Sequence, residues 1–243
     1  MAFKIAYGAG HNNHTANGIP KALDANNTNE WLLNDRVARH FAAAAQQYEN
    51  VELLRVDDPK GEKPVDLSQR CKDANAWGAD FFLSIHHNAG INLGSGGGLV
   101  AFCYKAGTTA EKYQKAIYNA CIAAGGLKGN RSDPTPEKGY YVLVNTDAPA
   151  VLMEYGFMDS RTDAPVILQE DYAKRMAYAT MEGIAEVAGL KKKAAAENNA
   201  STASNTFYRV QVGAFNDPAN AERLRDELKA KGYKDAFVVT VKR

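Results

Sequence analysis

The segment from residue 80 to residue 88 reads DFFLSIHHN, an apolar run that ends in two adjacent histidines. A short apolar run of this kind is typical of a strand buried in the middle of a sheet. The run Phe3–Tyr7 predicts a second such strand, and it leads through the residues GAG to His11. In an open α/β sheet, ligands and catalytic groups collect where strands end. We therefore expect His11 and His86 to lie near one another.

Around these two runs, β-rich segments alternate with segments of helical periodicity up to about residue 190. This alternation predicts an α/β fold, with a twisted, mostly parallel or mixed sheet flanked by helices. Six strands are expected, at Phe3–Tyr7, Val51–Val56, Phe81–His86, Gly98–Tyr104, Tyr140–Val144 and Ala150–Glu154. Four helices are expected, at Glu30–Gln47, Asp66–Trp77, Thr109–Ala124 and Asp171–Val187.

The composition changes after Leu190 to small and polar residues, which predicts a flexible linker. Order is expected to resume at Phe207 with a strand, a helix and a second strand, which form a small βαβ unit. These segments are Tyr208–Val212, Pro218–Lys231 and Ala236–Val241. The predicted organisation is thus a large domain (1–190), a linker (191–206) and a short C-terminal unit (207–243). Such a short unit buries little surface alone, so we expect it to dock or to pair with another copy.

Charge and composition exclude several classes of protein. The 243 residues include 29 basic and 28 acidic side chains, which gives no electrostatic argument for nucleic acid or an anionic membrane as partner. No stretch approaches the ~20 apolar residues of a membrane-spanning helix, and the N-terminal residues do not resemble a signal peptide. The three cysteines form no C-x-x-C pair, so we expect buried free thiols and synthesis in a reducing cytoplasm.

The histidines at the strand ends and an acid between them suggest a metal site. His11, Glu30 at the start of a helix, and His86 supply the three ligands that a catalytic zinc ion needs beside its open water position. His14 and Asp24 compete for these ligand roles. A second interpretation is purely structural, with the histidines in polar surroundings and Glu30 placed against the positive end of the helix dipole.

Two further residues are interpreted from their surroundings. Glu154 lies in the apolar segment 149–157, where an unpaired buried carboxylate is costly, so it either faces a polar site or is exposed at the end of a strand. Beside a zinc-bound water it would act as a general base. His87 should point to the face opposite His86, because side chains alternate along a strand. His40, in the middle of a helix, is interpreted as a surface or packing residue.

Four motifs together resemble a known family. They are GH at 10–11, the acid at position 30, SIHHNA at 84–89 and YVLVNTDAPAVLMEYGF at 141–157. These motifs resemble the zinc-dependent N-acetylmuramoyl-L-alanine amidases of the amidase type 3 group, over about residues 2–188. The last motif is the most specific, because its length and order are hard to match by chance.

The resemblance implies a peptidoglycan hydrolase that cuts the bond between N-acetylmuramic acid and the L-alanine of the stem peptide. It implies one zinc ion held by His11, Glu30 and His86, with Glu154 as the catalytic acid. The sequence departs from the family pattern at residues 7–13, which read YGAGHNN where D-P-G-H-G is common, and at position 87, where a small residue is usual.

We expect Asn88 and Asn12 to contact the substrate.

The C-terminal segment has its own resemblance. Its sequence FYRVQVGAF at 207–215 and the helix that follows resemble the SPOR repeat, a module that binds peptidoglycan glycan strands. Only about half of the usual domain is matched, so we expect two chains to pair their tails in a homodimer. Tyr208, Gln211 and Phe215 are expected to contact the cell wall.

The expected role is therefore that of a lytic, antimicrobial enzyme of the phage endolysin type. It would act on the cell wall after holin-dependent or lysis-dependent release. The alternatives are a mother-cell autolysin of sporulation with the same activity, a zinc peptidase that cuts within the stem peptide, and a non-catalytic protein that only binds muropeptides.

Overall fold

The computed structural model describes residues 2–194, 212–233 and 236–240. The chain divides into two compact units, Met1–Ala196 and Glu197–Arg243, which are described separately. Most of the predicted linker 191–206 lies outside the described residues. Its first residues pair with the large unit, since the Glu49 amide donates to the Lys191 carbonyl at 2.9 Å and the Lys193 amide to the Gln47 carbonyl at 2.7 Å. The predicted domain boundaries stay predictions.

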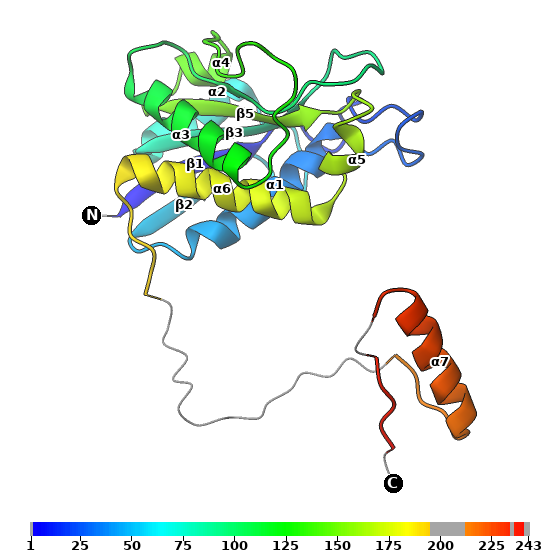
Figure 1. The fold of residues 1–243 in the computed structure, drawn as a ribbon. Coiled ribbons are helices and arrows are strands. Elements are labelled where there is room, and N and C mark those ends of the chain that lie inside the picture. Colours follow the sequence, from blue (N-terminus) through cyan, green and yellow to red (C-terminus); the bar gives the residue numbers. More distant parts are fainter. Residues whose placement is uncertain (1, 195–211, 234–235, 241–243) are drawn as a thin grey trace. The chain divides into compact units, whose positions relative to one another are not determined.

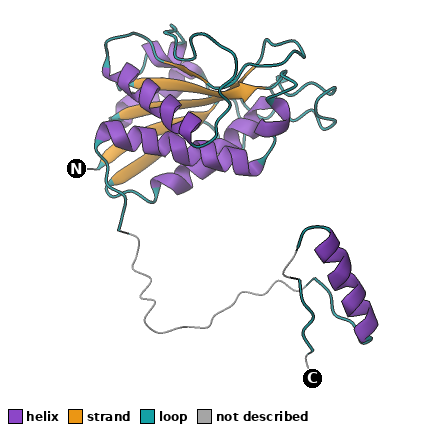
Figure 2. Cartoon of the chain, viewed as in Figure 1, coloured by secondary structure: helices purple, strands orange, loops and turns teal. Residues whose placement is uncertain are grey.

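The large unit is built on a five-stranded sheet with the order β2-β1-β3-β5-β4. Four strands run parallel, and β4 is antiparallel at the edge beside β5. Figures 1 and 2 show this twisted sheet between layers of helices. The strands are β1 (Phe3–Ala9), β2 (Val51–Arg55), β3 (Phe81–Asn88), β4 (Val100–Phe102) and β5 (Ala150–Phe157).

Helices cover both faces of the sheet, so the structure has three layers (Figure 1). One face carries α1 (Glu30–Ala45), α3 (Thr109–Ala123) and α6 (Glu170–Ala188), and α6 packs against both α1 and α3. The other face carries α2 (Leu67–Trp77) and the short α4 (Tyr141–Val144). The single turn α5 (Ala164–Ile167) packs against β5 and α6.

Burial of both sheet faces explains the continuous apolar runs of the central strands. Alternate residues of β3 enter the two cores, with Phe81, Leu83 and Ile85 on the α1/α3/α6 side and Phe82 on the α2/α4 side. All residues of β5 are buried. Strands covered on both faces lose the alternation of apolar and polar residues. The α/β architecture predicted from the sequence, a mostly parallel sheet flanked by helices, is confirmed.

The predicted count of six strands is wrong for the described residues, because Tyr141–Val144 of the predicted strand 140–144 form the helix α4. The amide of Val144 donates to the Tyr140 carbonyl, and the side chains of Asn145 and Thr146 donate to carbonyls of the same turn. The aromatic and β-branched residues of this segment favour a strand, but tertiary packing overrides such preferences. The predicted strand Gly98–Tyr104 is also shortened, to β4.

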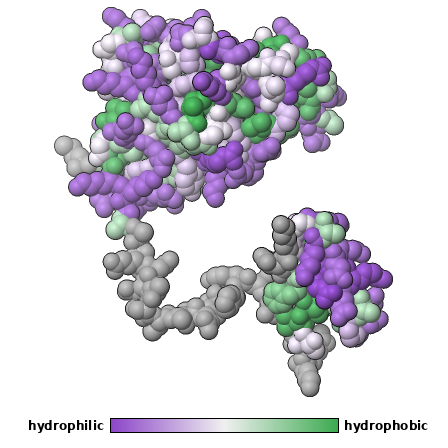
Figure 3. Space-filling model, viewed as in Figure 1, coloured by the Kyte–Doolittle hydropathy of each residue, from purple (hydrophilic) through white to green (hydrophobic). Residues whose placement is uncertain are grey.

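The small unit contains the predicted helix, α7 (Pro218–Ala230), which is capped by the Asp217 side chain accepting from the Ala219 amide. The first predicted strand, Tyr208–Val212, lies almost entirely outside the described residues. The second, Ala236–Val241, is wrong over the described residues 236–240, which are not in a strand. In Figure 3, hydrophobic residues gather on this unit beside the hydrophilic surface of α7.

The cysteines and the hydropathy of the helices were both considered in the sequence. Cys71, Cys103 and Cys121 are all buried free thiols, as expected. Among the described helices, none combines the length and the hydropathy that crossing a membrane requires.

One close approach between helices gives a testable prediction of stability. A Cβ atom at Gly183 in α6 would lie 2.6 Å from the Cα atom of Ile117 in α3, so the backbones themselves would have to separate. We expect Gly183→Ala to lower the free energy of unfolding in urea by about 1–2 kcal/mol, after subtracting the roughly 1 kcal/mol by which alanine favours a helix over glycine.

The matched control is Gly139→Ala, because a Cβ atom at Gly139 meets nothing within 4 Å. Equal stability of the Gly183→Ala protein and the wild type would contradict the close packing of α3 and α6.

Candidate metal centre

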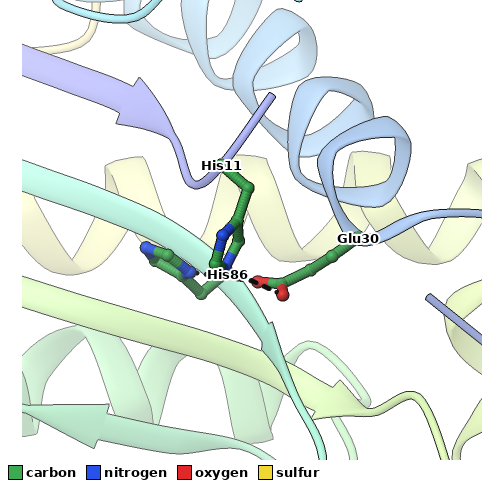
Figure 4. A group of neighbouring side chains, drawn as sticks. All are labelled: His11, Glu30 and His86. Carbon is green, nitrogen blue, oxygen red and sulfur yellow. Dashed lines mark hydrogen bonds and ion pairs between the residues drawn. The ribbon is translucent and has the colours of Figure 1, made fainter. Parts of the chain in front are cut away.

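Three side chains from three elements converge at the carboxyl end of the sheet (Figure 4). His11 follows β1, Glu30 is the first residue of α1, and His86 lies near the end of β3. The His11 Nε2 and Glu30 Oε2 atoms are 3.0 Å apart, and so are the His86 Nδ1 and Glu30 Oε1 atoms. One ligand atom from each residue lies within 4.8 Å of the other two. The structure therefore brings the three predicted metal ligands together.

The backbone that carries His11 is held by buried charged side chains. His11 has a φ of 64°, a left-handed conformation that non-glycine residues seldom adopt. The Arg70 guanidinium donates to the carbonyls of Ala9 at 2.6 Å and His11 at 3.1 Å. The Asp57 carboxylate accepts from the Ala9 amide at 3.0 Å. These contacts fix the end of β1 and offset the strain at His11.

Glu30 is a buried carboxylate at the start of α1. Asn29 caps this helix by accepting from the Leu32 amide at 2.9 Å, which sets where the helix begins. Burial would raise the pKa of Glu30, but hydrogen bonds and charge interactions with His11 and His86 hold this pKa well below its usual range. Glu30 therefore presents a negative charge to the two imidazoles.

The His86 ring occupies space that only a glycine leaves free. Gly10 runs beside His86, because its amide donates to the Ile85 carbonyl at 2.8 Å. A Cβ atom at Gly10 would lie 2.0 Å from a carbon of the His86 ring. The GH pair of the sequence motif thus serves two predicted ligands, since Gly10 makes room for His86 and His11 is the other.

Glu154 stands beside this group on β5, where it pairs in register with His86 on β3. Its side chain is buried, and its Oε2 atom has no hydrogen-bond partner among the described residues. Burial, together with the nearby charge of Glu30, raises the pKa of Glu154 well above its usual value. A carboxyl group with a raised pKa beside a cleft is suited to accept and return a proton.

The ligand group and Glu154 face a common cavity of about 500 Å³. Its lining is mostly polar and comes from the loop after β1, the start of α1 and the ends of β3 and β5. The lining residues are His11, Ala16, Asn17, Gly18, Glu30, His86, His87, Asn88, Ala89, Glu154 and Met158.

Of the two residues expected to contact substrate, Asn88 lines this cavity and Asn12 is not among its lining residues. The Asn12 side chain accepts from the His14 amide at 2.9 Å within the loop. Both substrate roles stay predictions. Phe215, expected to contact the wall, is exposed in the small unit, while Tyr208 and Gln211 lie outside the described residues.

The competing ligand candidates lie elsewhere. His14 is exposed in its loop, and the Asp24 carboxylate accepts from the amides of Asn26 and Thr28. His40 pairs with Glu170, with 2.8 Å between its Nε2 atom and the carboxylate.

One buried polar pair was not foreseen from the sequence. The His87 ring lies against Tyr155 of the core, and its Nδ1 atom lies 2.8 Å from the Asn34 side-chain oxygen. Burial lowers the pKa of His87 to about 3, so its ring is neutral. Asn34 lies one helical turn after Glu30, and this i, i+4 spacing was the only available signal for it.

The donor set fits zinc. Two imidazole nitrogens and one carboxylate are ligands that zinc takes in catalytic sites, where a fourth position stays open for water. The cavity beside the three residues provides access to such a position. An α/β sheet that carries this set at its strand ends, next to a buried carboxyl group, has the arrangement of a metal-dependent hydrolase.

The chain belongs to the N-acetylmuramoyl-L-alanine amidase family. The model of this family, Amidase_3, matches residues 5–186, and the model described as the SPOR domain matches residues 204–243.

Among curated proteins, the chain is similar to the sporulation-specific N-acetylmuramoyl-L-alanine amidase of Bacillus subtilis, with 34% identity over 79% of this chain and 69% of that protein. It is also similar to the endolysin of Bacillus phage SPP1, with 32% identity over 53% of this chain and 47% of that protein.

Among solved structures, the catalytic domain of CwlV, an N-acetylmuramoyl-L-alanine amidase from Bacillus (Paenibacillus) polymyxa var. colistinus, shares the fold. The TM-score is 0.68 at 20% identity, over 78% of this chain and 99% of that domain.

The contact between Gly10 and His86 predicts how the site can be damaged without touching a ligand. We expect Gly10→Ala to push the His86 ring out of place and so to lower zinc binding by at least tenfold, an effect of the size seen when groups that orient metal ligands are removed. Zinc affinity is measured by competition with a chromogenic chelator. Gly139→Ala is again the control, and unchanged zinc affinity in Gly10→Ala would contradict the geometry described here.

Proposed function

We propose that this chain is a zinc-dependent N-acetylmuramoyl-L-alanine amidase. It would hydrolyse the amide bond between the lactyl group of N-acetylmuramic acid and the L-alanine of the stem peptide. Membership of the amidase family supports the reaction. The convergence of His11, Glu30 and His86 within 4.8 Å is the observation that carries the zinc dependence.

In the proposed reaction, His11, Glu30 and His86 bind the zinc ion and Glu154 transfers the proton. A zinc ion held by the three ligands would polarise the scissile carbonyl and lower the pKa of its water toward ~7. Glu154, with its raised pKa, accepts the proton of the attacking water and returns it to the departing amine nitrogen. The Glu154 Oε2 atom has no hydrogen-bond partner among the described residues, so this oxygen is available to accept the proton. No covalent bond between enzyme and substrate is required.

The two alternative activities are less well supported. A protein that only binds muropeptides would not need a buried carboxyl group of raised pKa beside a metal-ligand set, since such a group is costly to bury. A peptidase that cuts within the stem peptide would use the same site chemistry, so the identity of the new amine decides between them.

The reaction is tested on purified cell walls. We expect digestion to release stem peptides with a new N-terminal L-alanine and glycan strands with free lactyl carboxyl groups, both visible by mass spectrometry. Removal of metal with a chelator should abolish release, and zinc should restore it, because the water is activated by the metal. New amines from inside the stem, or full activity after rigorous chelation, would contradict the proposal.

Substitution at the site separates binding from turnover. We expect Glu154→Gln to keep zinc and to lose about 10²–10⁴-fold in turnover, the range attributed to general acid–base catalysis. His86→Ala should lose both zinc and activity, because it removes a ligand. Metal analysis and turnover are measured on the same samples, and near-normal turnover of Glu154→Gln would remove Glu154 from this role.

We further propose that the protein acts as a phage endolysin that reaches the wall by holin-dependent or lysis-dependent release. The similarity to the phage SPP1 endolysin and the three free, buried cysteines, which fit folding in a reducing compartment, support this role. A mother-cell autolysin of sporulation is the second candidate, supported by the similarity to the sporulation-specific amidase of B. subtilis.

For the small unit we propose binding to peptidoglycan glycan strands, supported by the match to the SPOR domain. Val212, Phe215 and Tyr233 are large apolar side chains that lie exposed there. Exposed apolar groups mark contact surfaces, and we propose that two chains pair through this unit in a homodimer.

A further inference from the structure

A buried amide touches all three segments that carry the metal ligands. The Asn34 side-chain nitrogen lies 3.3 Å from Glu30 Oε1 in α1 and 3.2 Å from the Gly10 carbonyl, just before His11. Its side-chain oxygen lies 2.8 Å from the His87 ring, next to His86 on β3. Asn34 is fully buried, and His87 is almost so.

The partners of Asn34 define which way its amide points. The Glu30 carboxylate and the Gly10 carbonyl can only accept hydrogen bonds, so the NH₂ group of Asn34 must face them. The amide oxygen then faces His87, whose Nδ1 atom must carry a hydrogen and donate it. The flipped amide would aim its oxygen at these two acceptors, so Glu30 and Gly10 exclude it, and the hydrogen bond from His87 holds the orientation that remains.

The same pair fixes one oxygen of Glu30. Glu30 Oε1 lies 3.0 Å from His86 Nδ1, and it accepts from the Asn34 amide and from the backbone amide of His87 at 3.2 Å. The other oxygen, Oε2, contacts His11 at 3.0 Å. The side-chain amide of Asn34 and the backbone amide of His87 thus hold the Glu30 carboxylate in a single orientation between the two imidazoles.

We propose that Asn34, locked by His87, is a positioning residue that orients Glu30 and the end of β1 for zinc. This inference rests on the zinc site proposed above. Groups that hydrogen-bond to metal ligands set ligand orientation, and their removal typically lowers metal affinity or activity by about 10–100-fold.

The test measures zinc affinity by chelator competition in the full chain. We expect about 10–100-fold weaker zinc binding in Asn34→Leu, which keeps the side-chain volume and removes the hydrogen bonds, and a comparable loss in His87→Leu. The double variant should bind zinc no more weakly than Asn34→Leu alone, because His87 acts through Asn34. Saturating zinc should restore most of the turnover of Asn34→Leu, because the variant is folded and only its zinc affinity is weakened. If the variant had lost turnover because it was unfolded, added zinc would not restore it.

Gln114→Met is the matched control. Gln114 is also a buried amide, with its side chain donating to the Ala101 carbonyl at 2.7 Å, and it lies outside the residues that line the cavity. Its zinc affinity should stay within about twofold of wild type, because it touches no ligand-bearing residue. A loss of equal size in Gln114→Met would show a nonspecific effect and overturn the proposal.

Wild-type zinc affinity in folded Asn34→Leu, or losses that add in the double variant, would also overturn the positioning role. If Asn34→Leu does not fold, His87→Leu decides: a loss of tenfold or more supports the proposal, and an unchanged affinity overturns it. Failure of the wild-type chain to bind zinc is a different result, which contradicts the proposed function itself.

Discussion

The site depends on one buried carboxylate that two imidazoles share. Glu30 would be costly to bury as an isolated charge, and hydrogen bonds from His11 and His86 keep it ionised. Three elements must therefore meet at one point, since β1, α1 and β3 each supply one member. A metal cation at this point would replace the contacts of Glu30 with His11 and His86. The three side chains are already close together, so binding would not require them to move far.

The parallel sheet makes this meeting possible. β1, β3 and β5 are neighbours that run in one direction, so their carboxyl ends lie at one edge of the sheet. His86 and Glu154 are register partners on adjacent strands, which places the proposed proton acceptor beside a proposed metal ligand. Arg70 and Asp57 each fix the end of β1 by hydrogen bonds to its backbone. The same strand pairings therefore set both the fold and the geometry of the candidate site.

Sequence reasoning was most reliable where a single physical signal was strong. The apolar runs predicted the central strands, and the rule that groups collect at strand ends predicted that His11 and His86 would converge. It failed at residues 140–144, where strand-favouring side chains form a short helix held by Asn145 and Thr146. Asn34 was missed because nothing in a linear pattern shows that an amide one turn after Glu30 contacts β3 as well. Long-range contacts of this kind require the fold.

The central claim is that the three side chains bind a zinc ion, and anomalous diffraction from crystals of the zinc-loaded chain tests it most directly. We expect one zinc peak at about 2.0–2.2 Å from ligand atoms of His11, Glu30 and His86. Zinc bound elsewhere on the chain, or no zinc peak from a folded and fully loaded sample, would contradict it.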